Sequence, residues 1–409
     1  MSAIAETQID VAADDRLARR NALILAFAQA LAGANNTVIV GTAGIIGGVL
    51  AGDKSLATLP VSTYVMGMWA GTLPVGIIAR RFGRLAAFES GAFCGLLAGL
   101  ICATAVIQGS FALLCLGTFF GGLYAAAHQS YRFAAADTAS AAFKPRAISW
   151  VLAGGVLAGV FGPQLIILTK EMLPQYLFAA SYFAQAIVAV VAAGVLTLVR
   201  FPKPAHEIAP AGASRPLAEI FRQPKLIAAV ICGVASYSMM NLIMTSAPVA
   251  MVDCQHSVSD AALGLQWHVM AMYGPSFFTG SLIARFGSGR VVAAGLLIMA
   301  VGAVIGVMGI TIGHFWTDLI LLGAGWNFAY VGATASVTDC HRPHERNKVQ
   351  AVNDFLIFGS MAVGSYSSGQ VLAHFGWAAV NQVVLPVMVV AAAMLLWVTL
   401  VQRREAALP

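Results

Sequence analysis

The segment Gly76-Ile-Ile-Ala-Arg-Arg-Phe-Gly83 recurs 204 residues further along the chain as Gly280-Ser-Leu-Ile-Ala-Arg-Phe-Gly287. Each copy follows an apolar run, so the two copies occupy the same place in two halves of the sequence. A repeat at half the chain length, with both copies in the same orientation, is typical of transporters whose halves rock about a midplane site. The repeat therefore predicts two structurally related halves.

The composition indicates a membrane protein. Of the 409 residues, 59% are hydrophobic and 10% are charged, whereas soluble domains average about 45–50% and about 25%. This excludes a soluble enzyme, a disordered protein and a disulfide scaffold. The sequence also shows no nucleophile elbow, phosphate loop or paired carboxylates, so we expect no enzymatic activity. The excess of 23 Lys and Arg over 17 Asp and Glu is too small to indicate a nucleic-acid partner.

Apolar runs of about 20 residues, the length that crosses a bilayer, recur along the whole chain. We therefore expect an all-α membrane protein with twelve transmembrane helices. Residues 1–199 are predicted to form one six-helix bundle and residues 226–409 another. A Pro-rich linker with a short amphipathic helix at 200–225 separates them. The predicted spans are 22–50, 57–79, 85–107, 111–131, 147–169, 175–199, 226–252, 260–284, 291–312, 316–338, 349–372 and 377–400.

The basic residues predict the orientation of these spans. With twelve spans, 21 of the 23 Lys and Arg fall on one side of the membrane, and only Lys54 and Lys170 fall on the other. Positive charge is retained on the cytoplasmic side. We therefore expect a multi-pass protein of the bacterial inner membrane, embedded in the lipid bilayer, with both termini and the linker in the cytoplasm.

The repeated segment resembles the helix 2–3 loop motif of the major facilitator superfamily, and the resemblance covers the whole chain. That motif usually has Asp where this chain has Arg80. The resemblance implies two six-helix bundles that work by alternating access. It also implies gating loops built from Gly76, Arg81, Gly83, Arg84, Gly280, Arg285 and Gly287.

Two pairs of soft side chains lie in adjacent predicted helices. Met240 and Met244 are four residues apart, as are His268 and Met272, so each pair shares a helix face. Thioether and imidazole groups suit Cu(I) and select against Mg and Ca. Plain packing is the alternative, because Met is common in apolar helices. The predicted spans contain no mid-depth carboxylate, which argues against a proton relay through Asp or Glu.

The pattern M-x-x-x-M followed by H-x-x-x-M resembles the CcoA-like copper importers (CalT family) of the superfamily. The resemblance implies that Met240, Met244, His268 and Met272 bind copper as a transported substrate, with no resident cofactor. It further implies copper import for assembly of cbb3-type cytochrome oxidase, with a cytoplasmic copper chaperone or export ATPase as partner. We expect a monomer. Accessory metal contacts are expected at Cys232, Cys254 and His256.

A sister branch resembles RfnT proteins, which are associated with riboflavin, and it shares much of this region. Amide and aromatic groups in the predicted spans suit a flat heterocycle such as flavin. Riboflavin or another small heterocycle is therefore the alternative substrate. Drug efflux is favoured only by the glycines of the fifth span. The residues expected to line this alternative cavity are Gln29, Asn35, Asn36, Tyr64, Tyr124, Trp326 and Asn327.

Overall fold

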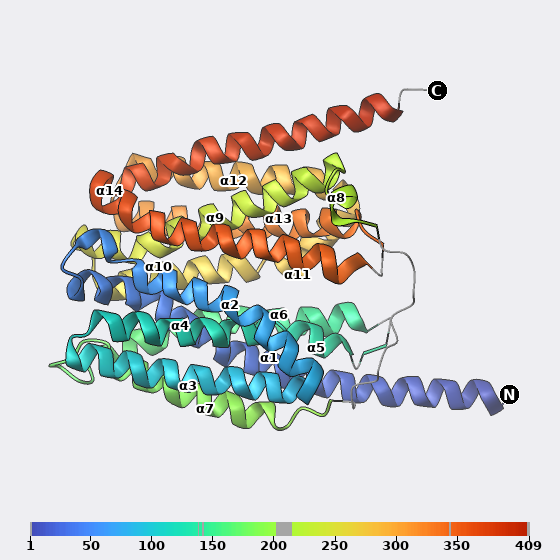
Figure 1. The fold of residues 1–409 in the computed structure, drawn as a ribbon, viewed down its shortest axis with the longest axis horizontal. Helices are drawn as coiled ribbons and strands as arrows, with labels where there is room; N and C mark the ends of the chain where they lie inside the picture. Colours follow the sequence, from blue (N-terminus) through green and yellow to red (C-terminus); the bar gives the residue numbers. More distant parts are fainter. Residues whose placement is uncertain (1, 138, 141–142, 202–214, 343–344, 407–409) are drawn as a thin grey trace. The chain divides into compact units, whose positions relative to one another are not determined.

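The computed structural model describes residues 2–137, 139–140, 143–201, 215–342 and 345–406. Every regular element in that part of the chain is helical, as the apolar runs predict. The helices form two compact units (Figure 1). The first unit contains α1 (Ser2–Leu50), α2 (Leu59–Phe82), α3 (Arg84–Gln108), α4 (Phe111–His128), α5 (Tyr131–Asp137), α6 (Lys144–Thr169) and α7 (Ala179–Leu196).

The second unit starts after the predicted linker, most of which lies outside the described residues. It also takes in the segment 53–58 from the first half of the chain. The amphipathic helix predicted at 215–225 corresponds to a single turn, α8. The elements of this unit are η1 (Lys54–Leu56), α8 (Leu217–Ile220), α9 (Pro224–Asp253), α10 (Val258–Tyr273), α11 (Ser276–Phe286), α12 (Ser288–Met308), α13 (Ile312–Thr338) and α14 (Arg346–Ala406).

Each of the twelve predicted spans falls on a helix. In the described part of the chain, ten segments are individually long and apolar enough to cross a membrane. One of them is the long α14, which breaks at Gly376, where φ is 78°, and so supplies two spans. The predicted span 260–284 is divided between α10 and α11 around Gly274 and Pro275. The backbone therefore follows the periodicity of the apolar runs.

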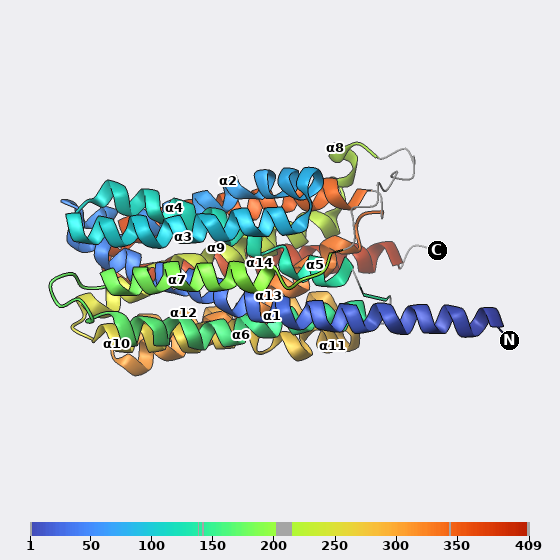
Figure 2. The ribbon, with the colours of Figure 1, turned by 90° about the horizontal axis from the view of Figure 1, so that it is seen from below.

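The two units repeat the same helix packing. In the first unit α1 packs on α6, α4 packs against both α2 and α3, and α3 packs on α7 (Figures 1 and 2). In the second unit α9 packs on α14, and α13 packs against both α10 and α12 in the same order. The sequence repeat is therefore a repeat of tertiary structure.

The repeated sequence ends in the same turn in each unit. Gly83 has φ 93° and ψ 163°, and Gly287 has φ 84° and ψ 150°, a conformation that residues with a Cβ rarely adopt. The expectation that Gly76 and Gly280 lie in loops is wrong. Both lie within helices, α2 and α11, because nothing before the positive-φ glycine interrupts the helix. The loop in each copy is therefore a one-residue turn.

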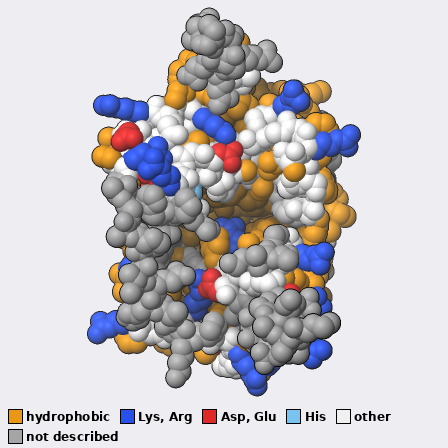
Figure 3. All heavy atoms as spheres, turned by 90° about the vertical axis from the view of Figure 1, so that its right-hand side faces the viewer, with side chains coloured by type: hydrophobic (Ala, Val, Ile, Leu, Met, Phe, Trp, Pro, Cys, Tyr) orange, Lys and Arg blue, Asp and Glu red, His pale blue; other side chains and the backbone are white. Residues whose placement is uncertain are grey.

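The arginines of the repeat lie at equivalent places. Arg81 lies over the ring of Phe82 at 5.3 Å, and Arg285 lies over Phe286 at 5.2 Å. Arg84 forms an ion pair with Asp137 of α5. Figure 3 shows Lys and Arg side chains on the face that it views. The orientation of the chain in the membrane stays a prediction.

The glycines of α6 bring it close to α1. A Cβ on Gly154 would lie 2.1 Å from the Ala26 carbonyl oxygen, and one on Gly162 would lie 2.5 Å from Cβ of Thr37. Small residues let transmembrane helices approach this closely. Close packing therefore accounts for these glycines, and the drug-efflux alternative stays a prediction.

Candidate functional site

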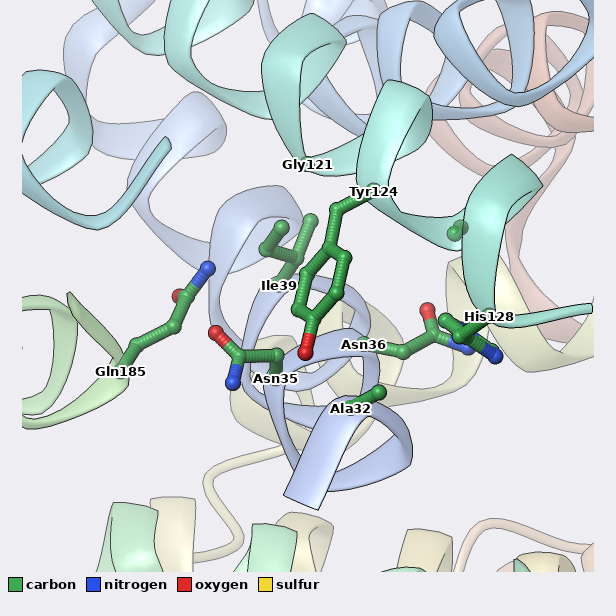
Figure 4. A pocket seen from close by; sticks show the side chains of 9 residues that line it. Ala32, Asn35, Asn36, Ile39, Gly121, Tyr124, His128 and Gln185 are labelled. Atoms are coloured by element: carbon green, nitrogen blue, oxygen red, sulfur yellow. The ribbon is translucent and has the colours of Figure 1, made fainter. Parts of the chain in front are cut away.

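A polar pocket lies inside the first unit, between α1, α4 and α7. Its empty volume is about 180 Å³. That volume includes open solvent and leaves no room for a water-sized sphere, so a ligand could enter only if the lining side chains moved apart. Its lining, most of which Figure 4 labels, comprises Ala32, Asn35, Asn36, Ile39, Gly121, Tyr124, Ala125, His128 and Gln185.

Helical spacing places these side chains together. Tyr124 and His128 are four residues apart on α4, so they share a face, and their rings pack edge to face at 6.0 Å. Gly121, one turn before Tyr124, presents no side chain to the pocket. A Cβ there would lie 2.2 Å from Cδ1 of Ile39. The empty space therefore depends on a glycine at this position.

Most polar atoms around the pocket have no partner within the described residues. They are Oδ1 of Asn35 and Asn36, the hydroxyl of Tyr124, Nε2 of His128 and both amide atoms of Gln185. A buried polar group without a hydrogen bond costs about 1–3 kcal/mol. These groups could form hydrogen bonds with water or with a ligand that enters once the lining moves apart. None of the lining residues carries a formal charge, so the complementary ligand surface is polar and neutral.

His128 is held in one tautomer by a neighbour. Nε2 of Gln29 lies 3.4 Å from Nδ1 of His128, and the amide N–H donates this bond. His128 Nδ1 therefore accepts, which places the ring proton on Nε2. That N–H is buried and has no partner in the described part of the chain. The pocket lining therefore includes a hydrogen-bond donor.

The structure brings together three of the seven residues expected in this cavity, namely Asn35, Asn36 and Tyr124. Gln29 does not line the pocket but hydrogen-bonds to His128, which does. Tyr64 packs near Gly121: a Cβ placed on Gly121 would lie 3.6 Å from Cδ2 of the Tyr64 ring. Gln185 of α7 also lines the pocket but was not among the expected residues. A Gln in an otherwise apolar helix is a sequence signal that could have identified it.

Trp326 and Asn327 lie in the second unit and have other surroundings. All the polar atoms of the Asn327 amide are used: Nδ2 donates to the Met272 carbonyl at 2.6 Å and to Ser276 Oγ at 2.7 Å. Its Oδ1 accepts from Thr279 at 2.6 Å. Asn327 therefore ties α13 to α10 and α11. Trp326 stacks on Tyr330 at 5.1 Å, and its buried Nε1 has no partner among the described residues.

The predicted copper ligands are mostly buried within the second unit. Met240, His268 and Met272 are buried, and Met244 is half-buried. Nδ1 of His268 donates to the Leu319 carbonyl of α13 at 2.7 Å, and its buried Nε2 is unpartnered in the described structure. A metal-binding histidine commonly has this arrangement, with one nitrogen anchored and the other free. Whether the four side chains converge on one ion stays a prediction.

The predicted accessory groups have other contacts. The buried Cys232 thiol donates to the Ala391 carbonyl at 3.6 Å, and the His256 Nε2 donates to the Ile310 carbonyl at 2.7 Å. Cys254 is half-buried. Within the described residues, no group of three or more His, Cys, Asp or Glu side chains could hold a metal ion. Any metal site here would therefore need the methionines.

One carboxylate, Asp318, lies deeper in its helix than the predicted span places it. Asp318 is completely buried in α13, and neither of its oxygens has a partner within the described residues. The sequence places it two residues inside the predicted span, but α13 begins earlier, at Ile312. The side chain therefore lies about 9 Å along the helix at 1.5 Å per residue.

Comparison with known proteins identifies the class of protein. The family model of the major facilitator superfamily matches residues 25–276 and 230–409. The chain belongs to this superfamily, and it is a multi-pass membrane transporter rather than an enzyme.

Individual relatives cover nearly the whole chain. The riboflavin transporter RfnT of Brucella anthropi is 47% identical over 375 residues, which are 91% of this chain and 94% of that protein. An uncharacterized MFS-type transporter of Bacillus subtilis, YddS, is 29% identical over 88% of this chain and 86% of its own.

Two solved structures share the fold. The nucleoside transporter NupG has a TM-score of 0.71 at 14% identity and covers 93% of this chain and 99% of its own. An inward-facing bacterial homolog of the human lysosomal transporter Spinster has a TM-score of 0.69 at 15% identity, with 93% and 97% covered. At these identities the likeness concerns the fold alone.

Proposed function

We propose that this protein transports riboflavin into the cell by alternating access. The observation that carries the proposal is the neutral pocket of the first unit, where five side chains leave buried donors and acceptors unpaired. The 47% identity to a riboflavin transporter over nearly the full chain supports the same substrate.

The chemistry of riboflavin complements this pocket. One edge of its isoalloxazine ring is an imide, which presents an N–H between two carbonyl oxygens. The N–H suits the free oxygens of Asn35 or Asn36, and the carbonyls suit the N–H of His128 and the amide of Gln185. The ring system is flat and uncharged, and the Tyr124 ring offers an aromatic surface. The lining side chains would have to move apart to admit the ring, because they leave no room for a water-sized sphere as they stand.

The proposed direction of transport is inward, and the driving gradient would set it. With both termini in the cytoplasm, the superfamily's two bundles would expose the pocket first to the outer side and then to the cytoplasm. A charged substrate would need a buried counter-ion, and the pocket lining has none. The proposal therefore concerns a neutral vitamin and not a phosphorylated flavin.

The first experiment measures riboflavin uptake and binding together. Cells that cannot synthesise riboflavin and express the protein should take up labelled riboflavin, and purified protein should quench its fluorescence. Tyr124→Phe and Asn36→Ala should each weaken binding about 5- to 100-fold, because each removes a hydrogen bond worth about 1–3 kcal/mol. Tyr176→Phe and Gln108→Ala, at exposed positions, are matched controls. Loss of binding in the controls, or none in the pocket variants, would contradict the proposal.

Copper import is a second candidate, and one observation favours it. His268 is anchored through Nδ1 and leaves a buried Nε2 lone pair free, which suits Cu(I). Met240, Met244 and Met272 would complete the ligand set, with Cys232, Cys254 and His256 as accessory groups. Cells carrying His268→Ala should then lose copper uptake and cbb3 oxidase activity. If the double variant Met240→Leu, Met272→Leu takes up riboflavin as wild type does, the riboflavin site does not involve these methionines of the second unit.

A further inference from the structure

The eighth predicted span is interrupted in the second unit. α10 ends at Tyr273 and α11 begins at Ser276, so the chain bends at Gly274 and Pro275. A Cβ on Gly274 would lie 2.8 Å from the Met270 carbonyl oxygen, so a side chain there would not fit the bend. Pro275 has no N–H to donate back along α10. The hydrogen-bond ladder of the span is therefore broken at these two residues.

Only one side chain of α11 is buried. It belongs to Thr279, whose exposed fraction is 0%, whereas the remaining residues of the helix are half-buried or exposed, among them Phe277 and Phe278. Thr279 Oγ1 donates to Oδ1 of Asn327 on α13 at 2.6 Å. Few buried contacts are typical of segments that open locally. The contact with Asn327 is therefore the principal polar attachment of α11 to its unit.

Asn327 holds both sides of the bend. Its Nδ2 donates at 2.6 Å to the Met272 carbonyl, which in an unbroken helix would accept from the backbone N–H of Ser276. The same nitrogen donates to Oγ of Ser276 at 2.7 Å. Together with the bond from Thr279, these contacts join the last turn of α10 to the first turn of α11. The buried amide therefore stabilises one angle between the two helices.

The first unit lacks this arrangement at the positions related by 204 residues. There α2 runs unbroken from Leu59 to Phe82, although Pro74 lies inside it. The equivalents of the four residues at the bend are apolar: Ala70 for Gly274, Gly71 for Pro275, Val75 for Thr279 and Leu123 for Asn327. The bend and its polar contacts are therefore a property of one half of the repeat and not of the fold.

We infer that α11 is a hinged arm that turns about Gly274 and Pro275, that Asn327 latches it in the conformation seen here, and that its movement is a step of the transport cycle. When the latch opens, water can replace Asn327 at the Met272 carbonyl. The Thr279 hydroxyl keeps a partner, because it also lies 2.8 Å from the Pro275 carbonyl of its own helix. The cost of opening is thereby limited.

Amide hydrogen exchange of the purified protein tests the latch without any substrate. In Asn327→Leu, the amides of 277–286 should exchange at least about tenfold faster than in wild type, because three hydrogen bonds that stabilise only the latched position are lost. Thr279→Val, which introduces the residue of the first unit, should raise their exchange about fivefold by removing one hydrogen bond. The amides of 73–82 in α2 should not change in either variant.

Asn241→Leu is the matched control. Asn241 is as buried as Asn327, and its Nδ2 donates to the Met361 carbonyl at 3.1 Å, so it ties α9 to α14. This variant should leave the exchange of 277–286 unchanged. Unchanged exchange there in both Asn327→Leu and Thr279→Val, or an equal increase throughout the second unit, would overturn the inference. Thr279→Val removes no volume from the core, so it decides the question if Asn327→Leu does not fold.

A second measurement removes the bend itself, and it rests on the proposed riboflavin uptake. In the double variant Gly274→Ala, Pro275→Ala, the new Cβ would clash with the Met270 carbonyl in the bent form, and the restored N–H favours a continuous helix. Riboflavin binding, which is proposed for the first unit, should keep the wild-type affinity, while uptake should fall several-fold because a conformational step is slowed. Pro74→Ala in the unbroken α2 is the matched control and should keep both.

The two measurements separate the arm from the substrate. Wild-type uptake by the double variant would overturn the inference. Wild-type protein that neither binds nor takes up riboflavin, but shows the faster exchange of 277–286 in Asn327→Leu, would contradict the proposed substrate alone. The hinged arm would then stand on the exchange result.

Discussion

Gln29 and His128 approach each other at 3.4 Å between Nε2 of the amide and Nδ1 of the ring, across the interface of α1 and α4. The contact favours the histidine tautomer with its proton on Nε2, which has no partner within the described residues. Gln29 is thus a positioning residue, one step removed from any substrate.

Replacement of Gln29 by Leu should weaken riboflavin binding by several-fold without unfolding the protein. The change releases His128 Nδ1, and the loss of one orienting hydrogen bond corresponds to about 1 kcal/mol. Fluorescence titration of the purified variant measures this effect. His128→Ala should weaken binding at least as much, and the double variant should be no worse than His128→Ala. Additive losses would show that Gln29 acts independently of His128.

Replacement of Gly121 by Val should abolish riboflavin binding by filling the pocket. The new side chain would displace Ile39, and overpacking of this kind costs about 1–3 kcal/mol of stability. Gly194→Val on α7, where a Cβ would meet nothing within 4 Å, is the matched control. Binding and melting temperature are measured on both variants. Intact binding in Gly121→Val would exclude this pocket as the site.

The contact between Arg215 and Glu345 should make the second unit sensitive to acid. The guanidinium donates to the carboxylate at 2.9 and 2.7 Å, and Glu345 is completely buried. Hydrogen bonds from Arg215 and from the Arg342 backbone hold the pKa of the Glu345 carboxyl well below its usual 4.5. The stabilisation is therefore present above pH 4.5 and is lost as the pH falls toward the lowered value.

Glu345→Gln should accordingly lower the melting temperature by several degrees at neutral pH and by less in acid. The melting temperature of purified protein, followed from pH about 7 to about 2, measures this difference. Lys225→Gln, which breaks the exposed 2.8 Å contact with Asp339, is the control and should have little effect. An equal loss at every pH would contradict the electrostatic explanation.

Cys254 should report the orientation in the membrane. In a variant with the other five cysteines replaced by Ser, a membrane-impermeant maleimide should label Cys254 from outside intact cells. Burial and the neighbouring Asp253 raise the pKa of this thiol. Because the thiolate is the reactive form, labelling should quicken as the pH rises. Labelling only after the cells are opened would reverse the predicted topology.

The architecture was predictable because periodic apolar runs and a direct repeat act over the whole chain. The helix ends were less predictable: α2 continues through Phe82 because only the positive-φ glycine stops it. Asn35, Asn36 and Tyr124 were recognisable as amides and an aromatic ring in apolar helices. Gln185 required knowledge that α7 packs beside α1, which sequence spacing does not give. Asp318 was missed because its depth depends on where α13 begins.

Riboflavin binding to purified protein, measured in parallel for wild type, Tyr124→Phe and Tyr176→Phe, tests the central claim most directly. The account predicts saturable binding by wild type and by Tyr176→Phe, and binding about 5- to 100-fold weaker in Tyr124→Phe. Wild-type protein that binds Cu(I) but no riboflavin, or equal riboflavin binding by all three proteins, would contradict it.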